Sequence, residues 1–419
     1  MKKFTVISLY TGAGGLDYGF EAAGFRTAVA VEMDERCVET IRLNRRWPVV
    51  QGDINLISTE AILAKAKLRC GEADALIGGP PCQPFSKSGF WATGTTKRLR
   101  DPRASTLENY LRVLEETQPR AFLIENVEGL GFRGKDEGLQ YISARLAEIN
   151  AKQGTKYRAT TAILNAVDYG VPQLRRRLFV VGARDGSAFT FPSPTHFAGD
   201  ELMATQDRHL TAWDALRSIR LHKEELEELR VRGKWADLLP SIPEGQNYLW
   251  HTERGGGEPL FGWRRRYWSF LLKLAKNTPS WTIQAQPGPA TGPFHWDNRR
   301  LSVTEMARLQ TFPNIQIAGS YADAQRQLGN AVPSLLAEVL ARAISSQLLG
   351  RALKGRPTLA IQPSPKPPIG PQKVAKVPET YLALRGDHDA HPGTGKGYRA
   401  SRLQQSLAPD AQEALELGR

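Results

Sequence analysis

Short apolar runs alternate with helical patterns along roughly the first 185 residues of the chain. Each run is rich in β-branched or aromatic residues and predicts a strand: Phe4–Leu9, Thr27–Val31, Ala75–Ile77, Ala121–Ile124, Ala159–Leu164 and Leu178–Gly182. Between two of these runs, one apolar helix face is formed by Leu107, Tyr110, Leu111 and Leu114. Strands that alternate with helices indicate a doubly wound parallel sheet with helices on both faces. We therefore predict an α/β domain over residues 1–185.

The alternation ends near Asp185, and an irregular stretch rich in Trp, Arg and Gly follows. This change predicts a second, smaller domain over residues 186–290, inserted into the first. Helical patterns then return. Ser302 and Glu305 have the spacing of a capping box, and a last helix has an apolar face made of Leu336, Val339, Leu340, Ala343 and Ile344. We predict that residues 291–350 return to the first domain.

The end of the chain has a different composition. Between Arg356 and Pro378 it is dense in proline and lysine, a composition that does not form a packed core. We therefore expect residues 351–419 to be a basic, proline-rich and flexible tail. A protein that ends near Gly350 should then stay folded.

Composition restricts the class of protein and its compartment. Hydrophobic residues make up 41% and charged residues 24%, and no apolar run approaches the roughly 18 residues of a membrane span. Gly12 interrupts the first apolar run, which therefore reads as a strand and not as an export signal. Cys37, Cys70 and Cys82 are too widely spaced to suggest a disulfide framework or a zinc site. We expect a protein of the cytoplasm or nucleoid with no membrane partner and no metal.

The net charge of +13 favours a polyanionic partner, because Lys and Arg release counterions when they bind phosphates. Charge alone is weak evidence, since many basic proteins bind no nucleic acid. The sequence motifs are more informative about function than the net charge.

Glycines follow the first strand in the segment from Tyr10 to Gly15 and open a helix. Such a turn allows a ligand to approach the backbone beside a helix N-terminus. The spacing departs from GxGxxG, which favours another nucleoside over a dinucleotide. Glu32 ends the second strand, where it can accept hydrogen bonds from ribose hydroxyls, and Asp53 is placed to meet an adenine amino group. Each feature alone also fits a plain turn or a helix cap, but together they favour an adenosine-type cofactor.

Cys82 follows another strand directly, in the segment GGPPCQPFS, and three prolines restrict its backbone. A buried structural cysteine is the alternative. The glycine-rich, basic segment from Lys87 to Arg103 suits a loop that closes over a phosphate-bearing substrate. Glu125 ends a further strand on the same rim of the sheet. Gln173, Arg175 and Arg177 alternate in an extended segment and therefore point to one side.

These segments, in their order, resemble the motif series of the cytosine carbon-5 DNA methyltransferases of the bacterial restriction-modification type. The matching pieces, from Phe4 to Gly350, are YTGAGG, VEMDE, GDI, GGPPCQPFS, ENV, QLRRR, RRLSVTEMARLQTFP and QLGNAVPSLL. The resemblance implies a Rossmann-like sheet that binds S-adenosylmethionine, with a smaller target-recognition domain inserted before the last motifs.

The resemblance also implies the catalytic roles. Cys82 would be the nucleophile, Glu125 the acid at ring nitrogen 3 of cytosine, and Arg177 the donor to the carbonyl at position 2. Arg175 would brace the Cys82 loop, and Asn126 the turn that faces the ring.

For S-adenosylmethionine, the resemblance places Tyr10 against the adenine, Glu32 on the ribose, Asp53 and Ile54 at the base, and Asn330 near the methionine portion. The family usually has phenylalanine where this chain has Tyr10. Further cofactor contacts are implied for Gly12, Gly14, Gly15, Leu16, Met33, Pro80 and Val332.

The implied reaction methylates carbon 5 of a cytosine in a specific double-stranded DNA sequence, through a covalent Cys82 adduct on a base flipped out of the duplex. Two alternatives stand beside it. One branch of the family methylates transfer RNA, but its CFT signature is absent here. Catalytically silent relatives typically lose the Cys or the Glu, and this chain has both. We expect a monomer, and a companion restriction endonuclease is a common arrangement in this family.

Overall fold

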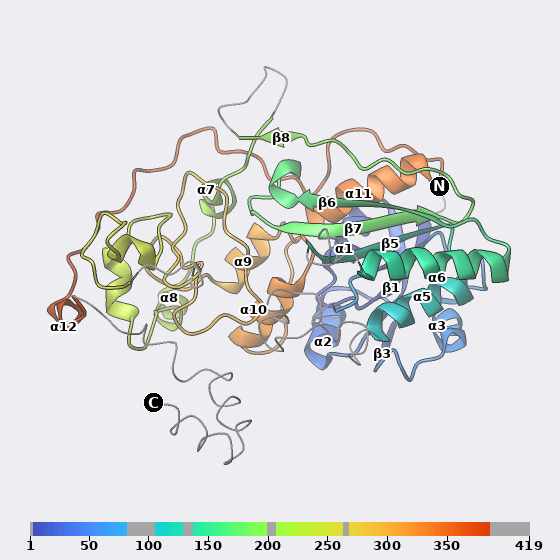
Figure 1. Cartoon of the computed structure of the whole chain (residues 1–419), viewed down its shortest axis with the longest axis horizontal. Coiled ribbons are helices and arrows are strands. Elements are labelled where there is room, and N and C mark those ends of the chain that lie inside the picture. Colours follow the sequence, from blue (N-terminus) through green and yellow to red (C-terminus); the bar gives the residue numbers. More distant parts are fainter. Residues whose placement is uncertain (1–2, 82–104, 129–136, 199–206, 263–267, 386–419) are drawn as a thin grey trace, which may run out of the picture.

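The computed structural model describes residues 3–81, 105–128, 137–198, 207–262 and 268–385. Over these residues the chain forms a sheet with helices on both faces, and an irregular region lies beside it (Figure 1). Cys82, the basic segment up to Arg103 and the arginines at 264–266 lie outside the described residues. No helix among those described is both long and apolar enough to cross a bilayer.

The central sheet has seven strands in the order β3-β2-β1-β4-β5-β7-β6. Their bounds are β1 Phe4–Leu9, β2 Phe25–Glu32, β3 Val49–Gln51, β4 Ala75–Gly78, β5 Ala121–Val127, β6 Arg158–Asn165 and β7 Arg176–Ala183. All six predicted strands are present. The sequence analysis did not predict β3, which is only three residues long.

One strand runs against the rest, contrary to the prediction of a parallel sheet. β7 pairs antiparallel with both β5 and β6. Only residues 166–175 connect β6 to β7, and a parallel neighbour would need a crossover of about a dozen residues or more. The short connection therefore forces the reversal.

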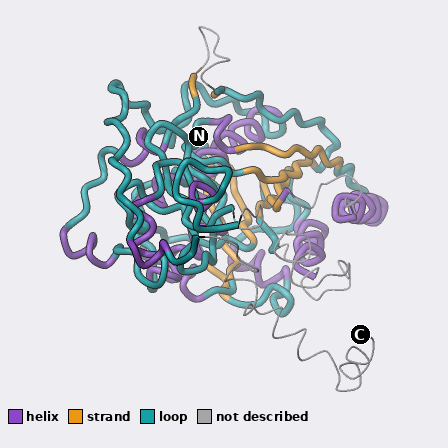
Figure 2. The backbone as a smooth tube through the Cα atoms, turned by 60° about the vertical axis from the view of Figure 1, so that its left-hand side comes forward, coloured by secondary structure: helices purple, strands orange, loops and turns teal. Residues whose placement is uncertain are grey.

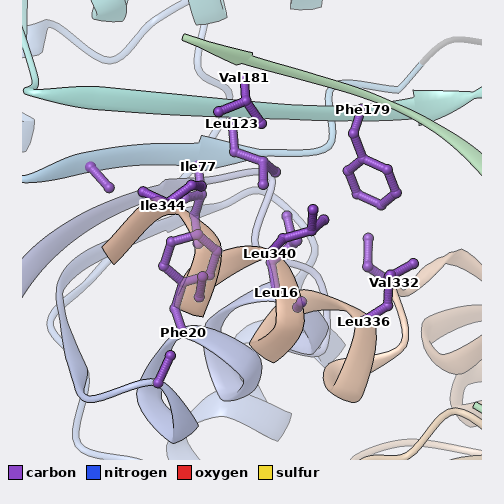
Figure 3. Packing of buried hydrophobic residues seen from close by; sticks show 14 of the residues in the cluster. Leu16, Phe20, Ile77, Leu123, Phe179, Val181, Val332, Leu336, Leu340 and Ile344 are labelled. Carbon is purple, nitrogen blue, oxygen red and sulfur yellow. The ribbon is translucent and has the colours of Figure 1, made fainter. Parts of the chain in front are cut away.

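Helices cover both faces of the sheet. On one face lie α3 (Thr59–Ala66), α5 (Ser105–Thr117) and α6 (Glu137–Gln153), whose apolar side chains pack on alternate strand residues. On the other face lie α1 (Gly15–Ala22) and α11 (Ser334–Gln347), with Leu16, Phe20 and Leu340 in the core that they share with the strands (Figure 3). The last predicted helix is present as α11, and it packs beside α1 against the sheet.

The remaining helices are short and lie around this core. They are α2 (Glu35–Asn44), α9 (Val303–Leu309) and α10 (Tyr321–Asn330) near the sheet, and α7 (Ala212–Leu216) and α8 (Lys223–Glu228) toward the irregular region. The predicted capping box is confirmed at α9: the Ser302 side chain accepts from the Glu305 amide, and the Glu305 side chain accepts from the Ser302 amide.

Loops dominate the irregular region (Figure 2), where the regular elements include only the two-residue strands β8 (His196–Phe197) and β9 (Asp207–Arg208) and short helices. It nevertheless has its own apolar core. Buried residues between Val231 and Phe294 pack together there, among them Leu238, Tyr248 and Phe261. The irregular sequence thus folds around aromatic and aliphatic side chains and not around regular elements.

Residues 351–385 differ from the flexible tail that the composition predicts. We call them the strap, because they run from the end of α11 across the molecule to α12 (Glu379–Leu382) at its far side (Figure 1). Near its start, the buried carboxylate of Glu338 in α11 accepts hydrogen bonds from the amides of Thr358 (2.7 Å) and Leu359 (2.9 Å). The strap is therefore fixed to the side of the molecule that contains the sheet.

Farther along, the strap is fixed to the irregular region. The Tyr381 ring stacks on Trp235 with 5.9 Å between ring centroids, and its hydroxyl donates to the Lys234 carbonyl at 2.6 Å. Ile361 and Tyr381 are buried in two different apolar clusters. The prediction of a flexible tail was wrong for the strap because its apolar residues are isolated in the sequence. They form no periodic apolar face from which their packing could be predicted.

We expect a protein that ends at Gly350 to be less stable by about 3 kcal/mol or more, since burial of a large apolar side chain contributes about 1.5–3 kcal/mol and the strap buries two. Urea unfolding followed by tryptophan fluorescence measures this. A protein that ends at Arg385 keeps the strap and is the matched control. Equal unfolding midpoints for the two proteins would show that the strap adds nothing to stability.

Candidate active site

Three of the described candidate residues lie at or near the carboxyl ends of central strands. Glu32 is the last residue of β2, Glu125 lies near the end of β5, and Pro80 follows β4. In doubly wound sheets this edge is where ligands bind. Pro81, the last described residue of this segment, directly precedes Cys82 in the sequence.

The glycine-rich turn after β1 is open toward this edge. Gly12 and Gly14 have φ of 57° and 88°, a region that favours glycine, and a Cβ built on Gly12 would meet nothing within 4 Å. Gly15 opens α1 against the carbonyl of Val332, where an added Cβ would come within 2.3 Å. The turn thus offers open backbone on one side and close packing on the other.

Glu32 is fixed at the end of β2 beside that turn. One carboxylate oxygen accepts from the Gly12 amide at 2.7 Å, and the other accepts from the Asp34 amide at 2.8 Å. Burial raises the pKa of Glu32, and these amide hydrogen bonds oppose the shift. Met33 next to it is 66% exposed, which leaves an apolar side chain free to contact a ligand. This combination fits the ribose and the base of a nucleoside.

The predicted adenine contacts lie on neighbouring loops. Asp53 follows β3, and its carboxylate accepts from the Asn55 amide at 2.9 Å. Ile54 is buried, and Tyr10 is partly buried against the same apolar cluster. The Tyr10 hydroxyl donates to the Thr106 carbonyl at 2.6 Å.

Three other candidates occupy different settings. The side chains of Leu16 and Val332 are buried in the core that α1 and α11 share with the strands (Figure 3), so they support the turn through packing. Asn330 is exposed at the end of α10, where it is accessible to a ligand.

Glu125 forms the centre of a charged cluster with Arg175 and Arg177. It is 8% exposed, and its Oε1 pairs with Arg177 Nε at 3.0 Å, which brings together two residues that are 52 positions apart in the chain. Its Oε2 faces the backbone of Gly79, where an added Cβ would lie only 2.8 Å away. Burial raises the pKa of Glu125, and Arg177 and Arg175 lower it in part. Burial therefore shifts Glu125 toward its protonated form, relative to an exposed glutamate.

Asn126 and Arg175 frame this cluster. The Asn126 amide group donates to the Pro80 carbonyl at 3.2 Å, which ties the end of β5 to the segment before Cys82. Arg175 is fully buried and donates from Nη2 to the Gly329 carbonyl at 2.8 Å. Its Nε and Nη1 have no hydrogen-bond partner among the described residues.

The structure adds contacts that the sequence did not reveal. Gln173 lies in the same extended segment as Arg175, but it is a structural link: its Oε1 accepts from the Ile283 amide at 3.1 Å, and Nε2 donates to the Leu309 carbonyl at 3.4 Å. The need for glycine at position 79 was also missed, because it depends on the approach of Glu125 from another strand.

A cleft of about 790 Å³ lies where the irregular region meets α10. Its lining includes Arg230 and Arg232 from the irregular region and Arg300, whose guanidinium lies 4.2 Å from the centroid of the Tyr321 ring. The carboxylates of Glu228 and Asp323 line it as well. The cleft thus combines arginines, an aromatic ring and two acids. No group of three or more His, Cys, Asp and Glu side chains among the described residues is arranged to hold a metal ion.

Comparison with known proteins gives consistent matches. The sequence model of the family described as C-5 cytosine-specific DNA methylase matches residues 4–346. The chain is 42% identical to the type II methyltransferase M.SacI of Streptomyces achromogenes over 369 residues, which cover 82% of this chain and 93% of that protein. It is 32% identical to M1.HphI of Haemophilus parahaemolyticus over 355 residues, which cover 81% and 86%.

Solved structures agree with the fold. The methyltransferase EhMeth of Entamoeba histolytica aligns with a TM-score of 0.55 at 18% identity, over 83% of this chain and 99% of that one. The Dnmt2 methyltransferase of S. pombe aligns with a TM-score of 0.53 at 17% identity, over 83% and 98%.

Proposed function

The chain belongs to the family of C-5 cytosine-specific DNA methylases and transfers methyl groups to carbon 5 of cytosine in DNA, and from the geometry of its site we propose which residues carry the reaction. The observation that supports the assignment most is the buried Glu125, paired with Arg177 and lying against Gly79, three residues before Cys82. The acid thus lies beside the segment that leads to the nucleophile in the sequence.

The chemistry explains why a thiol and an acid are needed. Carbon 5 of cytosine is a poor nucleophile, so electrons must first enter the ring. The Cys82 thiolate adds to carbon 6, and the electrons of the carbon 5–carbon 6 double bond become available at carbon 5. Carbon 5 forms the new bond to the methyl group as the bond between that group and the donor sulfur breaks. A base then takes the carbon-5 proton, and departure of the Cys82 sulfur as a thiolate restores the double bond.

Glu125 stabilises the charge that develops on the ring. As a carboxylic acid it donates a hydrogen bond to nitrogen 3, and the raised pKa that burial gives it favours this protonated form. Arg177, already at its side, donates to the carbonyl at position 2. Asn126 holds the Pro80 carbonyl, and the two donors of Arg175 without a described partner are available to the segment that carries Cys82.

S-adenosylmethionine supplies the methyl group when bound. We assign its ribose to Glu32, its base to Asp53, Ile54 and Tyr10, and its methionine portion to the neighbourhood of Asn330. The Gly12 turn offers the open backbone that such a ligand requires.

The substrate is proposed to be double-stranded DNA, with residues 186–290 as the target-recognition domain. All edges of the cytosine must be reached, so the base leaves the duplex at a cost of about a few kcal/mol. We propose that the arginines of the cleft beside α10 contact backbone phosphates. The protein is proposed to act as a monomer on intracellular DNA, together with a restriction endonuclease of the same site.

A filter assay with tritiated S-adenosylmethionine tests the substrate class. Incorporation into duplex DNA, with none into transfer RNA, is expected. Incorporation into transfer RNA alone would overturn the proposal.

Exchange of residues 186–290 for the corresponding segment of a relative with another specificity is expected to move methylation to the relative's sequence. Side chains from this segment read base edges, whereas the chemistry resides outside it. Bisulfite sequencing of DNA from expressing cells maps the sites. An active chimera that still methylates the original sequence would place specificity elsewhere.

A further inference from the structure

Tyr10 makes a contact that a phenylalanine at this position could not make. Its hydroxyl donates to the Thr106 carbonyl at 2.6 Å, across 96 residues of sequence. Thr106 lies in the first turn of α5, and Tyr10 lies directly after β1 with a φ of 55°, an uncommon conformation for a residue with a side chain. Burial raises the pKa of Tyr10, so the hydroxyl keeps its proton and remains a donor. The end of β1 is therefore joined to the start of α5.

The same turn of α5 holds the segment that leads to Cys82. The Thr106 side-chain hydroxyl donates to the Pro81 carbonyl at 3.1 Å. The preceding carbonyl, that of Pro80, accepts from Asn126 at 3.2 Å. Prolines have no N–H, so these two carbonyls are the only backbone hydrogen-bonding groups of Pro80 and Pro81. Both carbonyls accept a hydrogen bond, one from Thr106 of α5 and the other from Asn126 of β5.

The sheet closes this arrangement. Leu9 of β1 pairs with Gly78 of β4, so Tyr10 and Gly79 leave the sheet from adjacent strands. Pro81 is connected to this edge of the sheet in two ways. The backbone after β4 leads to it directly, and the hydrogen bonds from Tyr10 to Thr106 and from Thr106 to Pro81 connect it to the end of β1. The second connection fixes Pro81 through residues outside its own strand.

We propose that Tyr10 is a positioning residue for the nucleophile, acting through Thr106 to fix the Pro81 carbonyl directly before Cys82. This role rests on the proposed function of Cys82 and is separate from any contact of the Tyr10 ring with adenine. A phenylalanine keeps the ring but loses the connection to Thr106.

The test compares Tyr10→Phe and Thr106→Val with the matched control Tyr157→Phe. Tyr157 belongs to the same apolar cluster, and its hydroxyl also donates to a carbonyl, that of Pro119, at 2.6 Å. Two rates are measured on duplex DNA: kcat for methylation, and single-turnover formation of the covalent complex with DNA that contains 5-fluorocytosine. KM for S-adenosylmethionine and thermal stability are measured in parallel.

We expect Tyr10→Phe and Thr106→Val each to lower both rates about three- to tenfold, as loss of one hydrogen bond predicts, with little change in KM. The double variant should lose no more than the worse single variant, because the two hydrogen bonds act in series. Thr106→Ser keeps the hydroxyl and should restore the rate, and Tyr157→Phe should keep wild-type rates.

A Tyr10→Phe protein with wild-type rates would overturn the proposal, as would one changed only in KM. Multiplicative losses in the double variant would also overturn it, because they would show two independent contacts. Failure of the underlying function looks different: the wild-type protein itself would then form no covalent complex.

Discussion

Replacement of Cys82 by alanine is expected to abolish DNA methylation while leaving S-adenosylmethionine binding nearly intact. Without the thiolate, no electrons enter the ring at carbon 6 and carbon 5 remains inert. The cofactor residues lie on other loops, around Glu32 and Asp53. Tritium incorporation into duplex DNA and isothermal titration with the cofactor measure the two properties.

Cys70→Ala is the matched control, because Cys70 is an exposed free cysteine in the loop before β4. It should retain wild-type activity. Residual methylation by Cys82→Ala above the background without enzyme would rule out Cys82 as the nucleophile. Loss of cofactor binding would show that the substitution disturbs the fold.

Glu125→Gln is expected to lower kcat by about two orders of magnitude or more, the range typical of a lost catalytic acid. Glutamine has nearly the same shape and can donate a hydrogen bond, but its amide N–H is far too weak an acid to transfer a proton to nitrogen 3. Glu128→Gln is the matched control and should stay active, because Glu128 directly follows β5 and pairs with Arg176.

The pH profile gives a second readout of Glu125. Burial raises its pKa, so the acid form persists to higher pH than an exposed glutamate allows. In the wild type, the rate should fall as pH rises through this pKa, because the carboxylate cannot donate. Glu125→Gln should lack this fall. An unchanged kcat, or the same alkaline fall in the variant, would leave Glu125 with a structural role only.

Much of the fold follows from local patterns in the sequence. Strand positions were predicted because β-branched runs such as that from Phe4 to Leu9 end at clear turns, and the helix face around Leu111 has the right period. The predicted direction of β7 was wrong, because the direction of a strand depends on the length of the connection before it and not on the residues of the strand. The strap was missed because Ile361 and Tyr381 find their partners far away in the sequence.

The candidate site shows the same limit. Sequence order placed Glu32 and Glu125 at strand ends, and the structure has both there. The pairing of Glu125 with Arg177 could be expected only from the family, since β7 had to lie beside β5 first. The contacts of Gly79 and Thr106 join residues from different elements, and no local pattern encodes them.

The most direct test of the covalent mechanism uses duplex DNA with 5-fluorocytosine at the target site. Fluorine cannot leave carbon 5 as a proton does, so the adduct with Cys82 should persist. With S-adenosylmethionine present, wild-type protein should run as a protein–DNA complex on a denaturing gel, and Cys82→Ala should not. Normal turnover on ordinary DNA without any trapped complex would contradict the account.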